Sequence, residues 1–307
     1  MLDGIKKKMP KLYSFYGHLS RRKLIRDINK RKKIDEKQYP QMLAKEYKLR
    51  IGHELDWNNL RTYTEKMQWE KIYNKNPLKS MLADKLLVRE WVTEKIGAEY
   101  LIPLLGTWDS FDKIDFSKLP KKFVLKTNHG TGTNILVKNK EKMDNTDVKW
   151  KINDWLETDY GYKAALELHY SKINPVVLAE QYIETECGEL QDYKFLCFDG
   201  IPYFCWVDIG RYNNHTRNVY DLNWNLQPWN QEEYNHYKEP IAKPDNFEEM
   251  IRLVKVLSSG FSHVRVDLYN VKGRIYFGEM TFTNGSGFDR ILPTEYDLVL
   301  GDLWKID

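Results

Sequence analysis

The chain has 307 residues, of which 42% are hydrophobic and 14% aromatic, so it can bury a large core. This composition excludes a disordered chain, and no stretch approaches the roughly 20 uncharged apolar residues of a membrane-spanning helix. The first 35 residues lack the apolar run of a signal peptide, and the three cysteines lack metal-type spacing. We therefore expect a cytoplasmic protein with reduced thiols.

The net charge of +4 conceals a basic N-terminal segment. Residues 1–37 hold 13 of the 48 Lys and Arg residues but only 4 of the 44 Asp and Glu residues. Aromatic and aliphatic side chains are interspersed among these charges, which predicts an amphipathic basic helix. Its candidate partners are an anionic membrane surface, nucleic acid or an acidic polymer, and a solvated helical extension is the alternative.

Helical spacing follows in residues 59–73 and 80–95. On the second predicted helix, Lys85 and Arg89 are one turn apart, so both could point into one cleft; a solvent-facing surface is the alternative. Residues 111–120 read as a connecting loop, and residues 142–170 as a further helix. We expect its aromatic residues, including Trp150 and Trp155, to belong to the core.

Residues 122–137 have the pattern strand, small-residue loop, strand. Gly130 and Gly132 allow the backbone to turn tightly and aim its N–H groups at an anion, with Lys126 ending the first strand beside them. The loop is neither a P-loop, since no Gly-Lys-Ser/Thr follows, nor a dinucleotide fingerprint. It predicts a phosphate cradle, and an ordinary glycine-rich hairpin turn is the alternative.

Two more strands carry polar residues. Residues 175–183 form a predicted buried strand that ends in an acid, an amide and exposed backbone, groups that can bind an adenine edge and a ribose. The next strand, residues 192–198, contains Lys194 and leads through Asp199-Gly200 into residues 203–207. A lysine within a strand either extends to the surface or reaches a ligand.

Residues 263–279 read as a β-hairpin of alternating apolar and polar residues. Arg265 and Asp267 share one face because they are two residues apart, and Glu279 arrives from the neighbouring strand. Two carboxylates and a guanidinium suit hard cations and phosphoryl oxygens. The alternative is a half-exposed hairpin with a surface ion pair.

Taken in order, these motifs resemble the ATP-grasp superfamily and, more narrowly, the TupA-like (teichuronopeptide-biosynthesis-type) ATP-grasp proteins of bacterial surface-polysaccharide gene clusters. The resemblance covers about residues 55–305. It rests on Thr64-Glu65-Lys66-Met67-Gln68-Trp69, Ala83-Asp84-Lys85, Lys126-Thr127-Asn128-His129-Gly130, Asp192-Tyr193-Lys194-Phe195, Arg265-Val266-Asp267-Leu268-Tyr269 and Phe277-Gly278-Glu279.

The resemblance implies an α+β ATP-grasp fold, in which two α+β lobes hold ATP between antiparallel sheets. Four regions would follow: a basic helical N-terminal extension (1–54), a helical region of the ligase (55–120), a lobe with the glycine-rich phosphate loop (121–185), and a lobe with the metal and catalytic residues (186–307).

The resemblance also implies a site for ATP and Mg²⁺. The residues implied at ATP are Lys85 and Lys126 on the phosphates, His129, Gly130, Thr131 and Gly132 in the loop over them, Glu180, Gln181, Tyr182 and Ile183 at the adenine, Glu186 at the ribose, and Lys194 near the γ-phosphate. Those implied at the metal are Asp267, Glu279 and Thr281, with Arg265 stabilising the reacting groups. Where the superfamily usually has Glu-x-Asn, this chain has Glu279-Met280-Thr281; a hydroxyl can ligate Mg²⁺, and Asn284 lies nearby in sequence.

The implied activity is an ATP-dependent, ADP-forming carboxylate–amine ligase that acts through an acyl phosphate. Its partners would be a carboxylate-bearing sugar or polysaccharide precursor, such as a uronic acid, and an amine, in capsule or cell-surface polysaccharide biosynthesis. No nucleic acid is expected, and the basic N-terminus could contact the anionic inner face of the membrane. The alternatives are a glycosyltransferase, against which the chain lacks an Asp-x-Asp motif, and a non-catalytic binding protein of the same fold.

Overall fold

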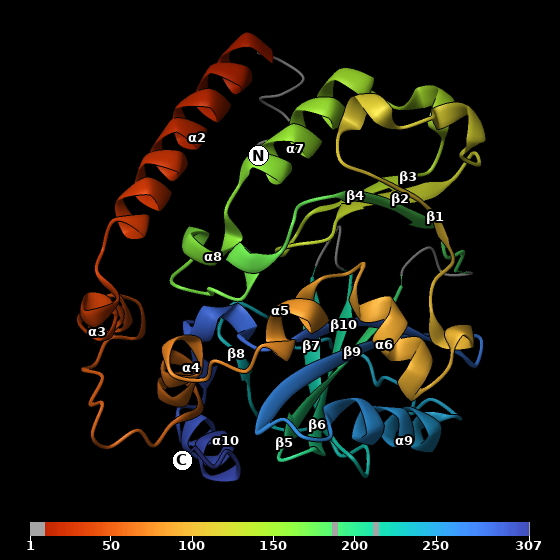
Figure 1. The fold of residues 1–307 in the computed structure, drawn as a ribbon. Coiled ribbons are helices and arrows are strands. Elements are labelled where there is room, and N and C mark those ends of the chain that lie inside the picture. The colour runs from red at the N-terminus through yellow and green to blue at the C-terminus, as the bar shows by residue number, and fades with distance from the viewer. Residues whose placement is uncertain (1–9, 186–189, 211–214, 307) are drawn as a thin grey trace.

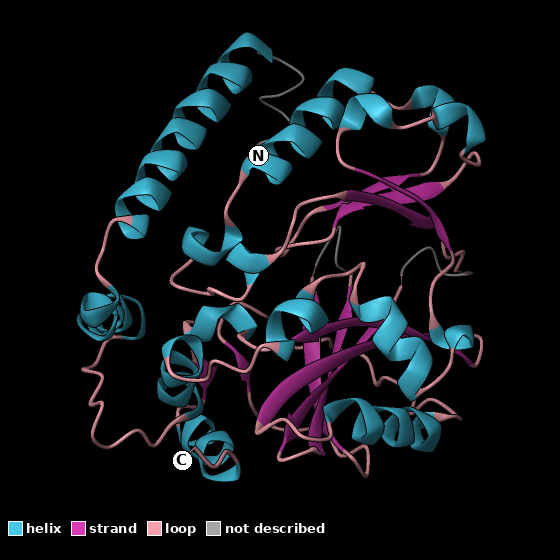
Figure 2. Ribbon diagram, viewed as in Figure 1, coloured by secondary structure: helices cyan, strands magenta, loops and turns pink. Residues whose placement is uncertain are grey.

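Two antiparallel sheets dominate the fold (Figures 1 and 2). The computed structural model describes residues 10–185, 190–210 and 215–306. The four-stranded sheet has the order β1-β4-β2-β3, the five-stranded sheet β10-β9-β5-β6-β7, and a small sheet pairs β11 with β8. The strands are β1 (Leu104–Trp108), β2 (Phe123–Thr127), β3 (Asn134–Val137), β4 (Val177–Gln181), β5 (Asp192–Phe198), β6 (Ile201–Ile209), β7 (Thr216–Asp221), β8 (Asn230–Gln231), β9 (His263–Val271), β10 (Arg274–Thr281) and β11 (Ile291–Leu292).

Helices flank both sheets (Figure 1). They are α2 (Pro10–Lys32), α3 (Tyr39–Ile51), α4 (Tyr63–Ile72), α5 (Leu78–Ala83), α6 (Val88–Lys95), α7 (Asn145–Glu157), α8 (Tyr160–Lys163), α9 (Phe247–Ser258) and α10 (Glu295–Leu303). None of them, within the described residues, is long and apolar enough to cross a membrane.

The four-stranded sheet packs one face against α7. Successive side chains of a strand point to opposite faces, so Phe123 and Leu125 of β2 are fully buried beside Ile152 of α7. The alternate residues Val124 and Lys126 line a cavity on the other face. One face of the sheet is therefore buried and apolar, and the other face carries Lys126 at the cavity.

The five-stranded sheet is covered on both faces. Phe195 and Val266 pack in the cluster that α5, α6 and α9 complete, whereas Leu196 and Trp206 pack in the cluster formed with α4 and α10. Asp192, two residues before Lys194 on β5, faces the cavity at the start of its strand. The same alternation places Asp192 and Lys194 on the face of β5 that carries Leu196, and of the two only Asp192 lines the cavity.

The N-terminal region contributes to the body of the protein. On α3, Leu43 and Tyr47 are fully buried and pack with Leu166 and Phe288. The Tyr47 hydroxyl lies 2.8 Å from the Thr64 hydroxyl of α4. One face of α3 is therefore part of the core, while the division of the chain into four regions stays a prediction.

The predicted helix 80–95 is wrong as a single helix. It is broken into α5 and α6, and the Asp84 carboxylate accepts from the N–H groups of Leu86 and Leu87. An aspartate that bonds nearby backbone in this way competes with helix formation. Lys85 consequently lies in the turn between the helices and not on a helix face.

The predicted helix 142–170 is also shorter than expected. It is divided into α7 and the single turn α8, where the Asp159 carboxylate caps the N–H of Gly161. Trp150 is 44% exposed, so the expectation that it belongs to the core was wrong.

Candidate active site

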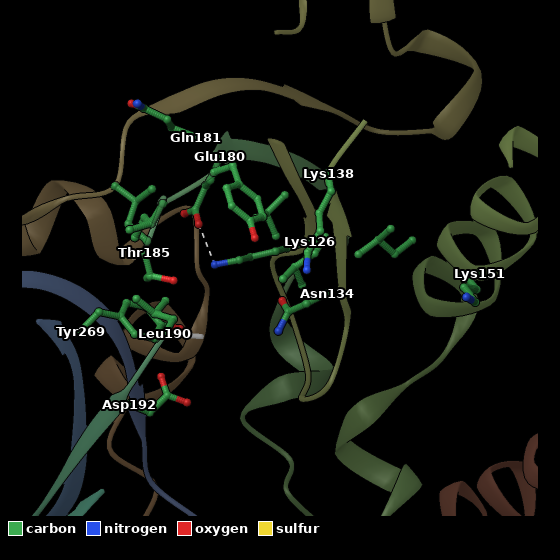
Figure 3. Close-up of a pocket in the computed structure, with 16 residues that line it drawn as sticks. Lys126, Asn134, Lys138, Lys151, Glu180, Gln181, Thr185, Leu190, Asp192 and Tyr269 are labelled. Atoms are coloured by element: carbon green, nitrogen blue, oxygen red, sulfur yellow. Dashed lines mark hydrogen bonds and ion pairs between the residues drawn. The ribbon is translucent and has the colours of Figure 1, made fainter. Parts of the chain in front are cut away.

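A cavity of about 470 Å³ lies between the two sheets (Figure 3). It is lined by Ile102, Val124, Lys126, Asn134, Ile135, Leu136, Lys138, Lys151, Glu180, Gln181, Tyr182, Ile183, Thr185, Leu190, Asp192 and Tyr269. Five of these, Lys126 and residues 180–183, are positions implied at ATP. Glu186, the implied ribose ligand, lies outside the described residues.

Lys126 and Glu180 form the charged centre of one wall. The Lys126 Nζ lies 2.6 Å from Glu180 Oε2 (Figure 3). Arg89 Nη1 lies 3.4 Å from Glu180 Oε1. Arg89 is held in place by its bond to the Ile102 carbonyl, at 2.8 Å. Neither Lys85 nor Arg89 is a lining residue, so the expectation that both point into one cleft stays a prediction; Arg89 contacts the lining residue Glu180.

Lys85 connects the glycine loop to the β9–β10 hairpin. Its backbone N–H donates to Asn128 O, and its Nζ lies 2.8 Å from Gly130 O and 3.7 Å from Glu279 Oε2. Burial lowers the pKa of Lys85, while Glu279 opposes that shift. Because the helix is broken at this point, Lys85 lies in a turn from which its Nζ reaches both Gly130 O and Glu279.

The loop between β2 and β3 needs glycine at two positions. Gly130 and Gly132 have φ of 75° and 73°, in the left-handed region that L-residues rarely adopt. At Gly130 a Cβ atom would also lie 2.3 Å from the ring of Tyr160. Thr131 and Gly132 are exposed at the tip, as expected for a loop that could fold over a ligand.

His129 lies apart from the cavity lining. Its imidazole is 2% exposed, Nε2 is 3.3 Å from Thr158 O, and the ring meets Tyr160 edge-on. Burial lowers the pKa of His129 to about 4, so the imidazole is neutral at physiological pH. The structure therefore places His129 as a support beneath the loop, not in the cavity.

The β9–β10 hairpin brings the implied metal ligands together. Glu279 pairs with Asp267 and Thr281 with Arg265 across the two strands. One nitrogen, Arg265 Nη2, lies 2.6 Å from Asp267 Oδ2, 3.2 Å from Glu279 Oε1 and 3.1 Å from Thr281 Oγ1. Arg265 is 8% and Asp267 2% exposed, so the alternative of a half-exposed hairpin with a surface ion pair was wrong.

Lys194 joins this hairpin to the cavity. Its Nζ lies 3.0 Å from Asp267 Oδ2, 3.2 Å from Asp192 Oδ2 and 3.6 Å from Asp208 Oδ2. Lys194 is only 3% exposed, so it does not extend to the surface. Since Asp192 lines the cavity, a continuous set of charges runs from the cavity wall to the hairpin.

Sequence reasoning missed the continuation of this network. Arg217 of β7 forms a two-pronged ion pair with Asp208, at 2.5 and 2.8 Å, and its guanidinium stacks on Trp206 and Tyr234. Burial alone would raise the pKa of Asp208, but Arg217 overcomes it and holds the pKa below its usual range. The sequence could have indicated Asp192, because it is two residues from Lys194 and so shares its face of β5. No local sequence pattern links Asp208 to Lys194; the pairing of β5 with β6 brings Asp208 opposite Asp192.

The segment Thr64-Glu65-Lys66-Met67-Gln68-Trp69 acts from α4 on the turn Asn284–Gly287. Gln68 Nε2 donates to Gly287 O and Lys71 Nζ to Ser286 O, each at 2.8 Å. Ser286 has a φ of 55°, which is uncommon for a residue other than glycine. Asn284 in this turn accepts a hydrogen bond from Arg265 Nη1. The helix therefore fixes the turn that contacts the central arginine.

The donor set suits Mg²⁺. Two carboxylates and a hydroxyl converge on one cationic nitrogen, and Mg²⁺ prefers oxygen ligands that include one or two carboxylates together with substrate phosphates. Within the described residues, no group of three or more His, Cys, Asp or Glu could hold a metal by itself. The Asn284 oxygen and the Thr281 hydroxyl both contact Arg265, so the geometry does not favour one over the other as a third ligand.

The sequence comparison assigns the family. Residues 65–305 match the family model described as TupA-like ATPgrasp. The chain belongs to the TupA-like ATP-grasp family. This match confirms the resemblance drawn from the motifs, and with it the α+β ATP-grasp fold preceded by a helical N-terminal region.

Solved structures show distant likeness to this TupA-like protein. D-alanine–D-alanine ligase from Bacillus anthracis with ATP is 15% identical with a TM-score of 0.38, over 66% of this chain and 54% of that one. The ATP-grasp ligase PsnB with minimal precursor, Mg and ADP is 12% identical with a TM-score of 0.39, over 79% of this chain and 66% of that one. L-amino acid ligase from Bacillus licheniformis is 15% identical with a TM-score of 0.40, over 73% of this chain and 48% of that one. The chain thus spans about half to two thirds of their lengths. No curated protein matches.

Proposed function

We propose that this TupA-like protein is an ADP-forming carboxylate–amine ligase. Its acid would be a uronic acid or a related acid of a bacterial capsule or cell-surface polysaccharide precursor, and its second substrate an amine. The observation that carries the proposal is a set of lysine–carboxylate pairs: Lys126–Glu180 at the cavity, Lys85–Glu279 and Lys194–Asp267. Phosphoryl transfer to a carboxylate brings two anions together, and such cations and metal-binding acids neutralise them.

ATP would bind with its adenine at residues 180–183 and its phosphates towards Lys126 and Lys85. The linker offers both exposed backbone and the apolar Tyr182 and Ile183, as nucleobase sites do. The Gly130–Gly132 loop would close over the phosphates with its N–H groups. Lys85 supports this arrangement because it already holds the Gly130 carbonyl.

Asp267, Glu279 and Thr281 would hold Mg²⁺. The ion would supply neutralising charge on the phosphates during transfer. Arg265 stays charged beside the same acids. Burial tends to lower its pKa, but Asp267 and Glu279 raise the pKa well above the ordinary value. A permanently charged guanidinium beside the metal ligands can stabilise negative charge that develops on the acyl group.

Two displacements complete the proposed reaction. A carboxylate oxygen of the acid attacks the γ-phosphorus, the bond to the bridging oxygen breaks, and ADP leaves with the electron pair. The amine nitrogen then attacks the acyl carbon, phosphate leaves, and the amine gives its proton to water or to the departing phosphate. Lys194 and Arg265 would hold the transferring groups in line.

ADP release tests the proposal. The purified chain is incubated with ATP, Mg²⁺ and a panel of uronic acids and amines, and we expect ADP and phosphate to form only when both substrates are present. With an acid alone, hydroxylamine should trap the acyl phosphate as a hydroxamate. Turnover of a nucleotide sugar without ATP would establish the glycosyltransferase alternative, and ATP binding without any turnover the non-catalytic one.

A further inference from the structure

Helix α2 has one face that is attached to the body of the protein. Arg31 Nη1 donates to the carbonyls of Tyr162 and Lys163, at 3.0 and 2.8 Å. Arg21 Nη2 lies 2.6 Å from Glu157 Oε2, and Ile28 is buried beside them. This inner face fixes the orientation of the helix, which lies at the edge of the molecule beside α7 and α8 (Figure 1).

The opposite face is basic and exposed. Arg22, Arg26, Lys30 and Lys33 are spaced by three and four residues, so they follow one stripe of the helix, and Lys23 flanks it. Between residues 20 and 34, six exposed positions are basic and none is acidic. Unlike the inner arginines, none of the four residues of the stripe forms an ion pair within the described part of the chain.

The stripe surrounds a shallow depression of about 370 Å³. Its lining residues are Arg22, Ile25, Arg26, Asn29, Lys30 and Lys33, all from this one helix. Ile25 is 39% exposed at its rim. Within the described residues, no second element walls this depression, and an apolar side chain lies among its cations.

We propose that this face of α2 binds the surface of an anionic membrane. An open row of cations around one apolar side chain fits a plane of anionic headgroups, where each Lys or Arg near the surface adds to binding. A linear acidic polymer is usually gripped in a groove, which one helix cannot form alone. The face lies outside the family match at 65–305, so the proposal does not depend on the ligase activity.

Co-sedimentation of the full chain with lipid vesicles tests the proposal. Wild-type chain should bind phosphatidylcholine vesicles that contain about 30% phosphatidylserine, bind pure phosphatidylcholine weakly, and lose most binding between about 50 and 500 mM salt. The variant Arg22→Gln/Arg26→Gln/Lys30→Gln should bind about 100-fold more weakly, since three surface charges are lost. Glutamine is a good helix former, so α2 should persist.

Two further variants make the result specific. Lys113→Gln/Lys118→Gln/Lys121→Gln removes the same charge from exposed positions elsewhere and should bind like wild type. Arg22→Lys/Arg26→Lys keeps the charge and should also retain binding. Equal binding by the stripe variant and the wild type would overturn the proposal. The proposal would also be overturned if the wild-type chain bound a soluble polyuronate but not the vesicles, and the stripe variant lost that binding. Neither assay contains ATP, so failure here leaves the proposed ligase untouched.

Discussion

Lys126 and Glu180 face each other from β2 and β4, with 2.6 Å between Nζ and Oε2, at the wall of the cavity. Arg89 contacts the other oxygen of the same carboxylate. Two cations therefore share one acid, which leaves a net charge of +1 on these three side chains. Under the proposed function, that charge would face the phosphates of ATP.

Lys126→Met should weaken ATP binding by about 1.5–3 kcal/mol, the range for a charge-assisted hydrogen bond, or roughly 10- to 150-fold in Kd. Removing the lysine also leaves the Glu180 charge facing the phosphates. Isothermal titration calorimetry measures the effect. The control is Lys113→Met, which removes an exposed lysine paired with Asp109. Unchanged affinity in the Lys126 variant would contradict the phosphate site.

Asp267→Asn and Glu279→Gln should both abolish turnover and the Mg²⁺ dependence of ATP binding, because each removes a charge that would hold the metal. Their effects on stability should differ. Asp267 is buried against Arg265 and Lys194, so its loss should cost about 3–5 kcal/mol, whereas the Glu279 side chain is 32% exposed and should cost at most about 1 kcal/mol.

Urea unfolding and Mg²⁺ titrations measure these effects, with Glu248→Gln as the control for an exposed acid. The informative variant is Glu279→Gln, because it should stay folded. If it unfolds on the scale of a core deletion, or retains full Mg²⁺ dependence, the hairpin is structural and the metal assignment fails.

The turn Asn284–Gly287 should control turnover more than ATP affinity. Lys71→Met removes the amino group that bonds Ser286 O, so Asn284 should lose its fixed position against Arg265. Lys66→Met is a matched control on the same helix, because its Nζ bonds the carbonyls of Gly301 and Trp304 instead. We expect comparable losses of stability, about 1–3 kcal/mol, but reduced turnover only in the Lys71 variant. Equal turnover in the two variants would refute this role.

His129 predicts an acid-sensitive fold. Its pKa is lowered to about 4 by burial, whereas the unfolded chain binds the proton near the ordinary value of about 6.5. The stability from neutral His129 is therefore present above pH 6.5 and is lost as pH falls towards 4, by up to about 1.4 kcal/mol per pH unit. Denaturant unfolding between pH 4.5 and about 6.5 should show a shallower pH slope in His129→Gln than in wild type. The exposed His53→Gln should leave the slope unchanged.

Much of the site was predictable because strands alternate. Arg265, Asp267 and Glu279 were assigned to one face of a hairpin from their spacing alone, and the structure confirms that arrangement. The hairpin around Gly130 and Gly132 follows from local rules too. Local patterns succeed where the residues that meet are close in sequence.

The rest depended on contacts between distant segments. Lys85 was placed on a helix because its neighbours have helical spacing, but Asp84 bonds the backbone beyond it and ends that helix. Arg217 carries no sequence signal for its role, since only the pairing of β6 with β7 sets it against Asp208. Trp150 shows the same limit, because composition alone cannot say which aromatic residue a surface helix leaves exposed.

Because α3 packs on the body of the protein, the folded unit begins before the family match at residue 65. A recombinant fragment that starts at residue 65 would satisfy the family boundary but would lack Leu43 and Tyr47. The apolar surfaces of Leu166 and Phe288, which those side chains cover, would then meet water. Expression trials, crystallisation and limited proteolysis of this chain should therefore begin their truncations no later than Tyr39.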